Sequence, residues 1–452
     1  MATIQSLPEE LLLVVVQMVQ RQEQQSHSIH SLSRSRSKLR ILLLLSLVCK
    51  SWREAILECG VLWASIAVDT SRDDCLAATL IMLGRSKGVE LELSMYFNAD
   101  GRIIEERTDR VLESILGHRA RITSLHMTGD LPFTLGRDAQ VLGMTAHAST
   151  PTNHPSLQTL SRRLSGLFRG LRELSLSSPS SSAVVRISEL LDIVNNSQGL
   201  ELLSLTSFLF TEEDRPSTCV VQPPRLRRLY LRECNSATVL SRLATPKTTV
   251  INIALKKPRA RRYPSIHGTH ILGALPPSLS SICTLEETTK LVFKEDKRGH
   301  YFGLELSSLC SQGPSVTIRR RSSSRERFIR ASLRAISENS YFDIIESFTF
   351  SYSSPVPAAW PMVFSRFCAL AELNTLVIHA ADVLHTLIQT TFDGTPPYFS
   401  LRRIRFFEQL PNQRHLFHGS QLFPAFHNFR AEYHCPRVRV TLHCFDGRKE
   451  EL

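Results

Sequence analysis

A short apolar pattern, L-x-x-L-x-L, recurs along the chain and constrains its fold more than any other feature. Four close copies begin at Leu171, Leu200, Leu226 and Leu401, and looser copies begin at Ile122, Ile345 and Leu373. The middle apolar residue falls at positions 174, 203 and 229 in one run of copies, and at 348, 376 and 404 in another, so the steps within each run are nearly equal. Because alternate residues of a strand share one face, each copy predicts a strand with an apolar face.

Helical patterns lie between these strands, in the ranges 187–194, 328–336 and 381–391. A strand and a helix of this size cannot bury their apolar faces alone, so such units are expected to stack. The steps lie in or at the edge of the period that is typical of leucine-rich repeats. The sequence therefore predicts an α/β fold, an irregular leucine-rich-repeat solenoid of strand–helix units. An ordinary α/β domain with several such strands is the alternative.

The period is imperfect in two places. The steps from 125 to 174 and from 291 to 348 are much longer than the others. The first gap contains a Pro/Ser/Thr-rich stretch at 148–156, and the second contains a basic segment at 319–330. These gaps predict irregular insertions or a missed repeat.

The amino-terminal segment follows a different, helical pattern. Ser6 and Glu9 fit a capping box, with Pro8 in the first turn, where its missing N–H costs little. Leu7, Leu11, Val15 and Val19 then recur at every fourth position along one stripe. Helical pattern resumes at Leu39, and Val48, Trp52, Ala55 and Cys59 are spaced as one helix face.

A polar stretch at 21–38 separates these two helical patterns. It is rich in Gln, Ser, Arg and His, and it ends in Ser33-Arg-Ser-Arg-Ser-Lys. We interpret it as a solvated insertion, with a short arginine-serine recognition tract as the alternative. A module of about 65 residues with such a loop buries little surface, so it is expected to be marginal alone and to share its apolar faces with a partner.

Three blocks of this module, in order, resemble an F-box. They are Leu7-Pro8-Glu-Glu-Leu11-Leu12, then Leu45-Ser-Leu47-Val48-Cys49-Lys50-Ser-Trp52-Arg53, then Leu62-Trp63-x-x-Ile66. The resemblance covers the range 5–68, and the repeats resemble the leucine-rich arm of many F-box proteins, notably fungal ones. One departure is the 21–38 insertion, because the linker between the first two helices is usually short.

The resemblance implies a three-helix module that binds a Skp-type adaptor and, through it, a cullin scaffold. The arm would then hold a target for ubiquitin transfer. The whole chain would be the target-recognition subunit of an SCF-type ubiquitin ligase. Carried over to this chain, the adaptor-binding residues begin with Leu7, Pro8, Leu11 and Leu12. Of the others, Leu45, Val48, Cys49 and Trp52 would be divided between the adaptor contact and the module's own core, and Leu62 and Trp63 would close the module and pack towards the arm. The expected domains are the F-box-like module at 1–69, the repeat domain at 70–446 and a tail at 447–452.

Residues that alternate with the inward leucines are expected to face solvent and to be available to a target. They are Arg228, Tyr230, Arg232, Arg403, Arg405 and Phe407. Guanidinium groups beside an aromatic ring suit carboxylates or a phosphorylated segment. The alternative is that these arginines only keep the sheet surface soluble.

Composition restricts the remaining classes. The formal charge is +12, and the apolar runs are too short to cross a membrane. Glu9 and Glu10 stand where a signal peptide would be basic, and the ten cysteines form no C-x-x-C pair. These features predict reduced thiols and a cytoplasmic or nuclear protein without a membrane partner.

Catalytic signatures are missing from the sequence. It has no phosphate-binding G-x-x-x-x-G-K-[ST] or G-x-G-x-x-G loop, no G-x-S-x-G and no H-E-x-x-H. His267, His270 and the pairs His434-Cys435 and His443-Cys444 lack a completed ligand set for a metal. We therefore expect a non-catalytic receptor without a cofactor or metal.

Two other functions remain open from the sequence. One is an adaptor-binding scaffold without a role in ubiquitination. The other is a basic nucleic-acid-binding repeat protein, for which 256–262 and Arg319-Arg320-Arg321 are the basic clusters. Solvated loops are the commoner explanation of such clusters, and no aromatic-interleaved stripe supports nucleic-acid binding.

Overall fold

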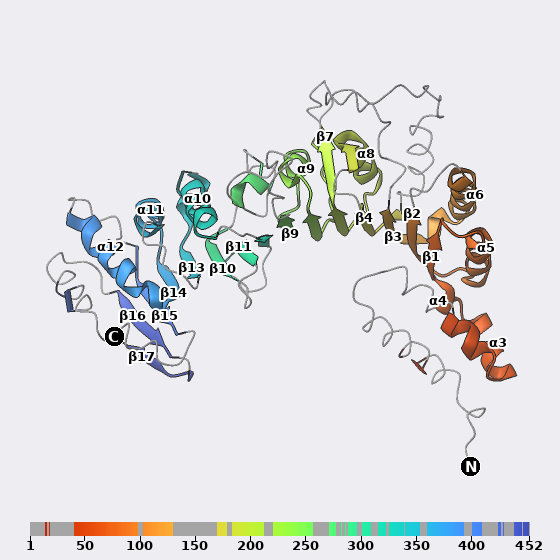
Figure 1. Ribbon diagram of the computed structural model, residues 1–452, viewed down its shortest axis with the longest axis horizontal. Coiled ribbons are helices and arrows are strands. Elements are labelled where there is room, and N and C mark those ends of the chain that lie inside the picture. The colour runs from red at the N-terminus through yellow and green to blue at the C-terminus, as the bar shows by residue number, and fades with distance from the viewer. Residues whose placement is uncertain are drawn as a thin grey trace, which may run out of the picture. The chain divides into compact units, whose positions relative to one another are not determined.

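The computed structural model is a mixed α/β structure (Figure 1). It describes residues 14, 15, 18, 40–97, 103–129, 170–178, 183–211, 220–255, 271–276, 282, 285, 288–295, 301–308, 315–321, 325–338, 340–352, 359–392, 400–408, 424–425, 428, 438–444 and 446–451. The chain divides into two compact units. The first unit is Met1–Ser217 with Pro223–Leu226, and the second is Thr218–Gln222 with Arg227–Leu452.

The first unit begins with helices and continues with parallel strands. After a helical stretch at 40–46, its helices are α3 (Lys50–Glu58), α4 (Gly60–Trp63), α5 (Cys75–Arg85), α6 (Ile103–Leu116) and α8 (Ile187–Asn196). Its strands are β1 (Ser65–Asp69), β2 (Leu91–Phe97), β3 (Ile122–Gly129), β4 (Glu173–Ser177), β5 (Ala183–Arg186), β6 (Leu202–Thr206) and β7 (Phe208–Thr211).

Strands β1, β2, β3, β4 and β6 of the first unit are neighbours in that order, and all of these pairs are parallel. Strands β5 and β7 form a separate parallel pair. The step predicted from 174 to 203 is confirmed here, because Leu174 is the register partner of Leu203. Both leucines are fully buried, so the pattern does place its apolar face inside.

The second unit carries the remaining strands and helices. Its strands are β8 (Arg228–Arg232), β9 (Val250–Leu255), β10 (Lys290–Glu295), β11 (Tyr301–Ser307), β12 (Ser315–Arg321), β13 (Ser347–Ser351), β14 (Glu372–Leu376), β15 (Arg403–Phe407), β16 (Arg439–His443) and β17 (Lys449–Glu451). Its helices are α9 (Ser236–Arg242), α10 (Arg325–Glu338), α11 (Ala359–Arg366) and α12 (Ala380–Phe392). Helices α10, α11 and α12 contact one another in succession (Figure 1).

An antiparallel meander interrupts the parallel order of the second unit. Strand β9 pairs in parallel with β12, while β12–β11 and β11–β10 are antiparallel, and β10 then pairs in parallel with β13. The meander lies in the long step from 291 to 348, so the irregular insertion predicted there is confirmed. The stretch 148–156 of the other gap lies outside the described residues.

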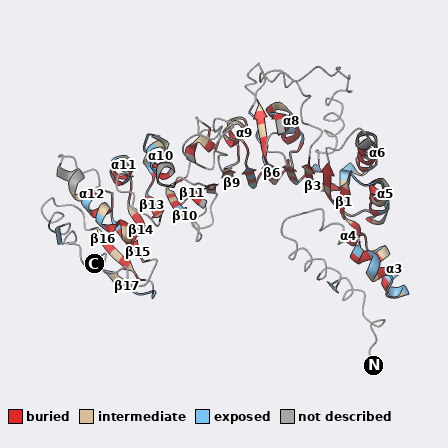
Figure 2. Ribbon diagram, in the orientation of Figure 1, coloured by how far each residue is buried: buried red, intermediate tan, exposed pale blue. Residues whose placement is uncertain are grey.

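The core is formed by the inward residues of the strands and by the helices that cover them (Figure 2). Predicted helices at 187–194, 328–336 and 381–391 are confirmed as parts of α8, α10 and α12. The strands predicted from L-x-x-L-x-L are confirmed as β3, β4, β6, β8, β13, β14 and β15.

One predicted register is wrong. Equal spacing placed Leu376 opposite Phe348 and Ile404, but the register partner of both is Leu373. The step from 348 to 373 is therefore shorter than the step from 373 to 404. Strand β14 ends at Leu376 and a short 3₁₀ turn, Val377–His379, follows, so the last two apolar residues of that copy do not continue the strand.

The segment 447–452, expected as a tail, contains β17, which pairs antiparallel with β16. Within the described residues, no helix is both long enough and apolar enough to span a membrane.

Candidate functional site

The amino-terminal helices have a small core of their own. Trp52 and Ile56 of α3 are buried, as are Leu62 and Trp63 of α4. The Trp63 indole N–H donates a hydrogen bond of 2.7 Å to the Ile56 carbonyl, and the Arg85 guanidinium lies 4.6 Å from the centre of the Trp63 ring. Trp63 therefore joins α3 to α5 through one hydrogen bond and one cation–π contact.

A turn separates α3 from the helical stretch at 40–46. Cys49 is the N-cap of α3, and its Sγ accepts a 3.5 Å hydrogen bond from the Trp52 backbone N–H. The Arg53 Nε donates to the Ser46 carbonyl at 3.1 Å, which ties the two helices together. The prediction of one helix face from Val48 to Cys59 is therefore wrong at both ends, since α3 spans only Lys50–Glu58.

Apolar side chains are exposed on the helical stretch and on the turn that follows it. Leu47 is 69% exposed, and Leu43, Leu44 and Val48 are each about half exposed. In the same stretch Ile41 and Leu42 are buried. Leaving four neighbouring large apolar groups partly in water is costly, because full burial of such a side chain is worth about 1.5–3 kcal/mol and each of these has roughly half of that or more still to gain. This exposed apolar patch, defined as Leu43, Leu44, Leu47 and Val48, has the chemistry of a protein-binding surface.

The predicted adaptor residues fall into three groups. Leu7, Pro8, Leu11 and Leu12 lie outside the described residues. Val48 is exposed, whereas Leu45 and Cys49 are half-buried. Trp52, Leu62 and Trp63 are buried within the module. Sequence reasoning missed Leu43, Leu44 and Leu47, because every residue from 41 to 45 is apolar and the periodicity does not say which side is covered.

The predicted target residues fall into two groups, one on β8 and one on β15. Arg228, Tyr230 and Arg232 are exposed on β8, as the alternation predicts. On β15 the Arg403 side chain lies 3.5 Å and the Arg405 side chain 2.7 Å from the same carboxylate oxygen of Glu372. The single Glu372 carboxylate therefore offsets about half of the positive charge of the two β15 arginines, whereas Arg228 and Arg232 have no ion pair with another described residue.

Phe407 is half-buried against a histidine. Its ring centroid lies 4.7 Å from that of His443 on β16, its register partner. Burial lowers the pKa of His443, and the nearby charges of Lys449 and Arg405 lower it further. Phe407 is thus partly covered by a neutral ring of the protein itself.

The basic cluster Arg319-Arg320-Arg321 is not a loop. It forms the end of strand β12, with Arg319 exposed and Arg320 only 6% exposed. Burial lowers the pKa of Arg320. The interpretation as a solvated loop is wrong here, because strand alternation turns the middle arginine inward. The other basic cluster, at 256–262, lies outside the described residues.

A polar cluster on β2, β3 and β4 was not predicted. The Ser124 Oγ lies 3.1 Å from His126 Nε2 and 3.3 Å from Glu173 Oε2, and Glu92 Oε1 lies 3.9 Å from the same Nε2. Among the described residues no carboxylate bonds the other ring nitrogen of His126. The cluster therefore lacks the order of a nucleophilic triad, in which an acid orients the histidine from its far side.

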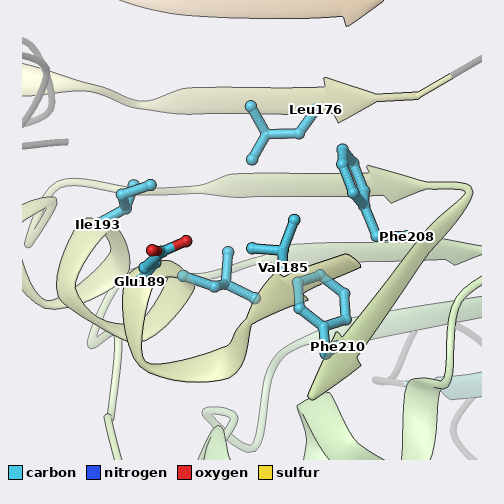
Figure 3. A pocket seen from close by; sticks show the side chains of 7 residues that line it. Leu176, Val185, Glu189, Ile193, Phe208 and Phe210 are labelled. Atoms are coloured by element: carbon cyan, nitrogen blue, oxygen red, sulfur yellow. The ribbon is translucent and has the colours of Figure 1, made fainter. Parts of the chain in front are cut away.

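An apolar recess lies between α8, β4, β5 and β7. Figure 3 shows Glu189 and Ile193 projecting into it from α8, and Phe208 and Phe210 from β7. Its lining is Leu176, Val185, Glu189, Leu190, Ile193, Phe208 and Phe210. All of these except Glu189 are buried, so the recess belongs to the packing of the first unit.

Most of the candidate metal residues lie outside the described residues. They are His267, His270, His434 and Cys435. His443 and Cys444 lie on or next to β16. In the part of the chain that the structure describes, no group of three or more His, Cys, Asp or Glu side chains is placed to hold a metal ion.

Comparison with known proteins identifies the amino-terminal module. The range 4–69 matches the family described as F-box-like, which confirms the resemblance seen in the three sequence blocks. Domains of this family act as protein-interaction adaptors, typically bind Skp-type adaptors in SCF complexes, and are generally non-catalytic. No curated protein matches the chain significantly.

Proposed function

We propose that this chain is the target-recognition subunit of an SCF-type ubiquitin ligase. Its F-box-like module would bind a Skp-type adaptor, and through it a cullin scaffold, while the range 70–446 would hold a target protein. The observation that carries the proposal is the exposed apolar patch inside the segment that matches the F-box-like family. A patch of this kind gains its stabilisation by contact with another polypeptide.

The range 70–446 would be an irregular leucine-rich-repeat arm. Support comes from the parallel strands β3, β4 and β6, in which Leu125, Leu174 and Leu203 of the L-x-x-L-x-L copies are in register. Repeat arms of stacked strands and helices present a long row of outward side chains on the sheet. Such a row is suited to hold an extended segment of a target.

The adaptor contact would combine the predicted residues with those that the structure exposes. Val48 and the neighbouring Leu47 would enter the interface directly, with Leu45 and Cys49 at its margin. Trp52, Leu62 and Trp63 would support the interface from inside, since they are buried. Leu7, Pro8, Leu11 and Leu12 remain part of the proposal from the sequence resemblance alone.

The decisive experiment measures adaptor binding by Leu47→Asp. A carboxylate at a position that is 69% exposed does little harm to the free chain, but it would be desolvated in an apolar interface. We expect the affinity for a purified Skp-type adaptor to fall by about tenfold or more. Co-purification followed by calorimetry measures the change.

The matched control is Leu80→Asp on α5, at a leucine that is 50% exposed and lies outside the segment that matches the F-box-like family. It should bind the adaptor as wild type does. Equal binding by Leu47→Asp and wild type would refute the docking surface. Trp52→Ala is unsuitable as a probe, because emptying a buried site would destabilise the module by about 3–5 kcal/mol.

An assay of ubiquitin transfer distinguishes a target receptor from a scaffold without a role in ubiquitination. A complex reconstituted with the adaptor and a cullin scaffold should modify a protein captured by the arm. Holding the target near the transfer site is the only contribution required of this chain, since proximity alone can supply a large part of a rate enhancement. Capture without modification would favour a scaffold without a role in ubiquitination.

A further inference from the structure

Helix α5 exposes large apolar side chains on its outer face. The helix contacts β1, α4 and α6 (Figure 1), and on its other side Leu80 and Ile81 are each 50% exposed. The exposed residues described for α8 and α10 are polar instead. They are Asp192, Asn195 and Asn196 in α8, and Arg330, Arg334 and Glu338 in α10. A helix that covers a sheet normally has a polar outer face, so the apolar face of α5 is suited to contact with another polypeptide.

The exposed apolar residues of α5 form a stripe that reads the same in both directions. Ala77, Leu80, Ile81 and Gly84 are all exposed, and their spacing places them on one side of the helix. Their sizes are small, large, large and small. If two copies of α5 lie antiparallel about a twofold axis between positions 80 and 81, Ala77 faces Gly84 and Leu80 faces Ile81. The stripe therefore has the self-complementarity that a twofold contact requires.

The small residues at both ends of the stripe provide room for such a contact. A Cβ placed on Gly84 would meet no atom within 4 Å, so the space above this residue is open. Packed helices lie about 8–10 Å apart, and small side chains allow the shorter distance. Leu80 and Ile81 of one copy could thus pack between the shallow ends of the stripe on the other copy.

The two ends of α5 carry opposite charge. The range 69–74 before the helix contains three aspartates and one arginine, Arg72, which forms an ion pair with Asp74. The range 85–88 at the other end contains Arg85 and Lys87 and no acidic residue. An antiparallel pair places the acidic end of each copy beside the basic end of the other, and Asp74 faces Lys87. A parallel pair would place like charges together, so the charges favour the antiparallel arrangement.

We propose that α5 is a self-association surface, which pairs antiparallel with α5 of a second copy of this chain. Helix α5 has 11 residues and is therefore about 16 Å long, so the contact is smaller than a standard protein–protein interface. The dimer forms with a dissociation constant in the micromolar range, on the order of 10–100 µM. The inference does not depend on the proposed function, because the four residues of the stripe lie outside the segment that matches the F-box-like family.

Sedimentation velocity of the full chain from about 1 to 200 µM tests the association. The average mass should rise with concentration from the 51.0 kDa of one chain toward twice that value. Leu80→Asp places a carboxylate beside its own symmetry copy in an apolar contact. It should raise the dissociation constant by about tenfold or more. The matched control is Leu47→Asp, the same substitution at an exposed leucine of another helical segment, and it should associate as wild type does.

A charge exchange tests the antiparallel arrangement. Asp74→Lys and Lys87→Asp should each weaken association by about twofold to fivefold, because each places like charges face to face. The double variant restores opposite charges across the axis and should associate more tightly than either single variant. Losses that simply add in the double variant would refute the pairing of Asp74 with Lys87.

Two further results would overturn the inference. One is a mass of one chain at every concentration, which would leave the apolar face of α5 to a different protein. The other is association of Leu80→Asp that equals wild type, or an equal loss in Leu47→Asp, which would place the contact elsewhere. Adaptor binding measured on the same variants should be reduced only in Leu47→Asp. Failure of self-association with adaptor binding intact would therefore refute this inference and leave the proposed function standing.

Discussion

His379 is the residue whose chemistry is most altered by the fold. It is fully buried, its Nε2–H donates a 2.8 Å hydrogen bond to the Tyr352 carbonyl, and its ring lies against Phe350 and Trp360. The other ring nitrogen has no hydrogen-bond partner among the described residues. Burial lowers the pKa of His379 to about 4, because a second proton would be placed among aromatic rings.

A pH dependence of stability follows from this burial. Between about pH 6.5 and pH 4 the unfolded chain binds a proton at His379 that the folded chain does not bind. The free energy of unfolding should therefore decrease as the pH falls through this window, by roughly 3 kcal/mol in total. Urea unfolding at several pH values measures the slope.

His379→Gln isolates that contribution. The glutamine amide can still donate to the Tyr352 carbonyl but does not titrate. The free energy of unfolding of the variant should therefore depend less steeply on pH, even if the variant is less stable than wild type. Other groups, including Asp382, whose pKa is raised by burial, titrate in both proteins and cancel in the comparison. Identical slopes in the two proteins would contradict the assignment.

At the scale of elements, Gly129 fixes how β3 ends beside β2. Its φ is +120°, and a Cβ there would lie 1.8 Å from the Phe97 carbonyl oxygen. Gly129→Ala should lower the free energy of unfolding by roughly 2–5 kcal/mol, from backbone strain and from steric overlap. A lower urea midpoint would report the loss.

Gly84 of α5 provides the control for that substitution. A Cβ at this position meets no atom within 4 Å, and the residue is helical. Gly84→Ala should therefore leave stability unchanged or raise it by up to about 1 kcal/mol. If both alanines had the same effect, the close approach at Gly129 would not be the cause.

Elements set by local alternation could be predicted from the sequence, and those set by distant pairing could not. In β8 the exposed Arg228, Tyr230 and Arg232 alternate with buried leucines, so strand and outward face were both predicted. The meander of β10, β11 and β12 has a reversed order in the sheet that no local pattern encodes. The register of Leu373 was missed for a related reason, since equal spacing is only an average property of irregular repeats.

The candidate sites likewise combine features that a local pattern predicts with features that depend on the pairing of distant strands. The family resemblance located the F-box-like module, but a continuous apolar run concealed which of its leucines are exposed. The burial of Arg320 depends on the pairing of β12 with β9, and in the sequence β10 and β11 lie between these two strands. Side chains brought together by nonlocal pairing carry no signature in a single sequence.

On the scale of the whole molecule, the charge of +12 and the exposed apolar patch make opposite predictions about salt. Binding driven by apolar burial should persist at about 0.5 M salt, whereas binding to phosphates of nucleic acid weakens steeply with counterion concentration. We expect the adaptor complex to survive a gradient that removes the chain from immobilised DNA. A DNA complex that resisted salt, without adaptor binding, would favour the nucleic-acid-binding alternative.

The contact of Trp63 with Ile56 and Arg85 has a consequence for geometry. Gly60, at the start of α4, lies against the backbone of Ser86. A Cβ at Gly60 would lie 2.8 Å from the Ser86 carbonyl oxygen. Helix α4 is thus seated on the end of α5 with no room for a spacer, and β1 begins at Ser65, almost directly after α4 ends. A partner bound to the exposed leucines of the helical stretch at 40–46 would therefore hold β1 and the strands beside it in a fixed orientation.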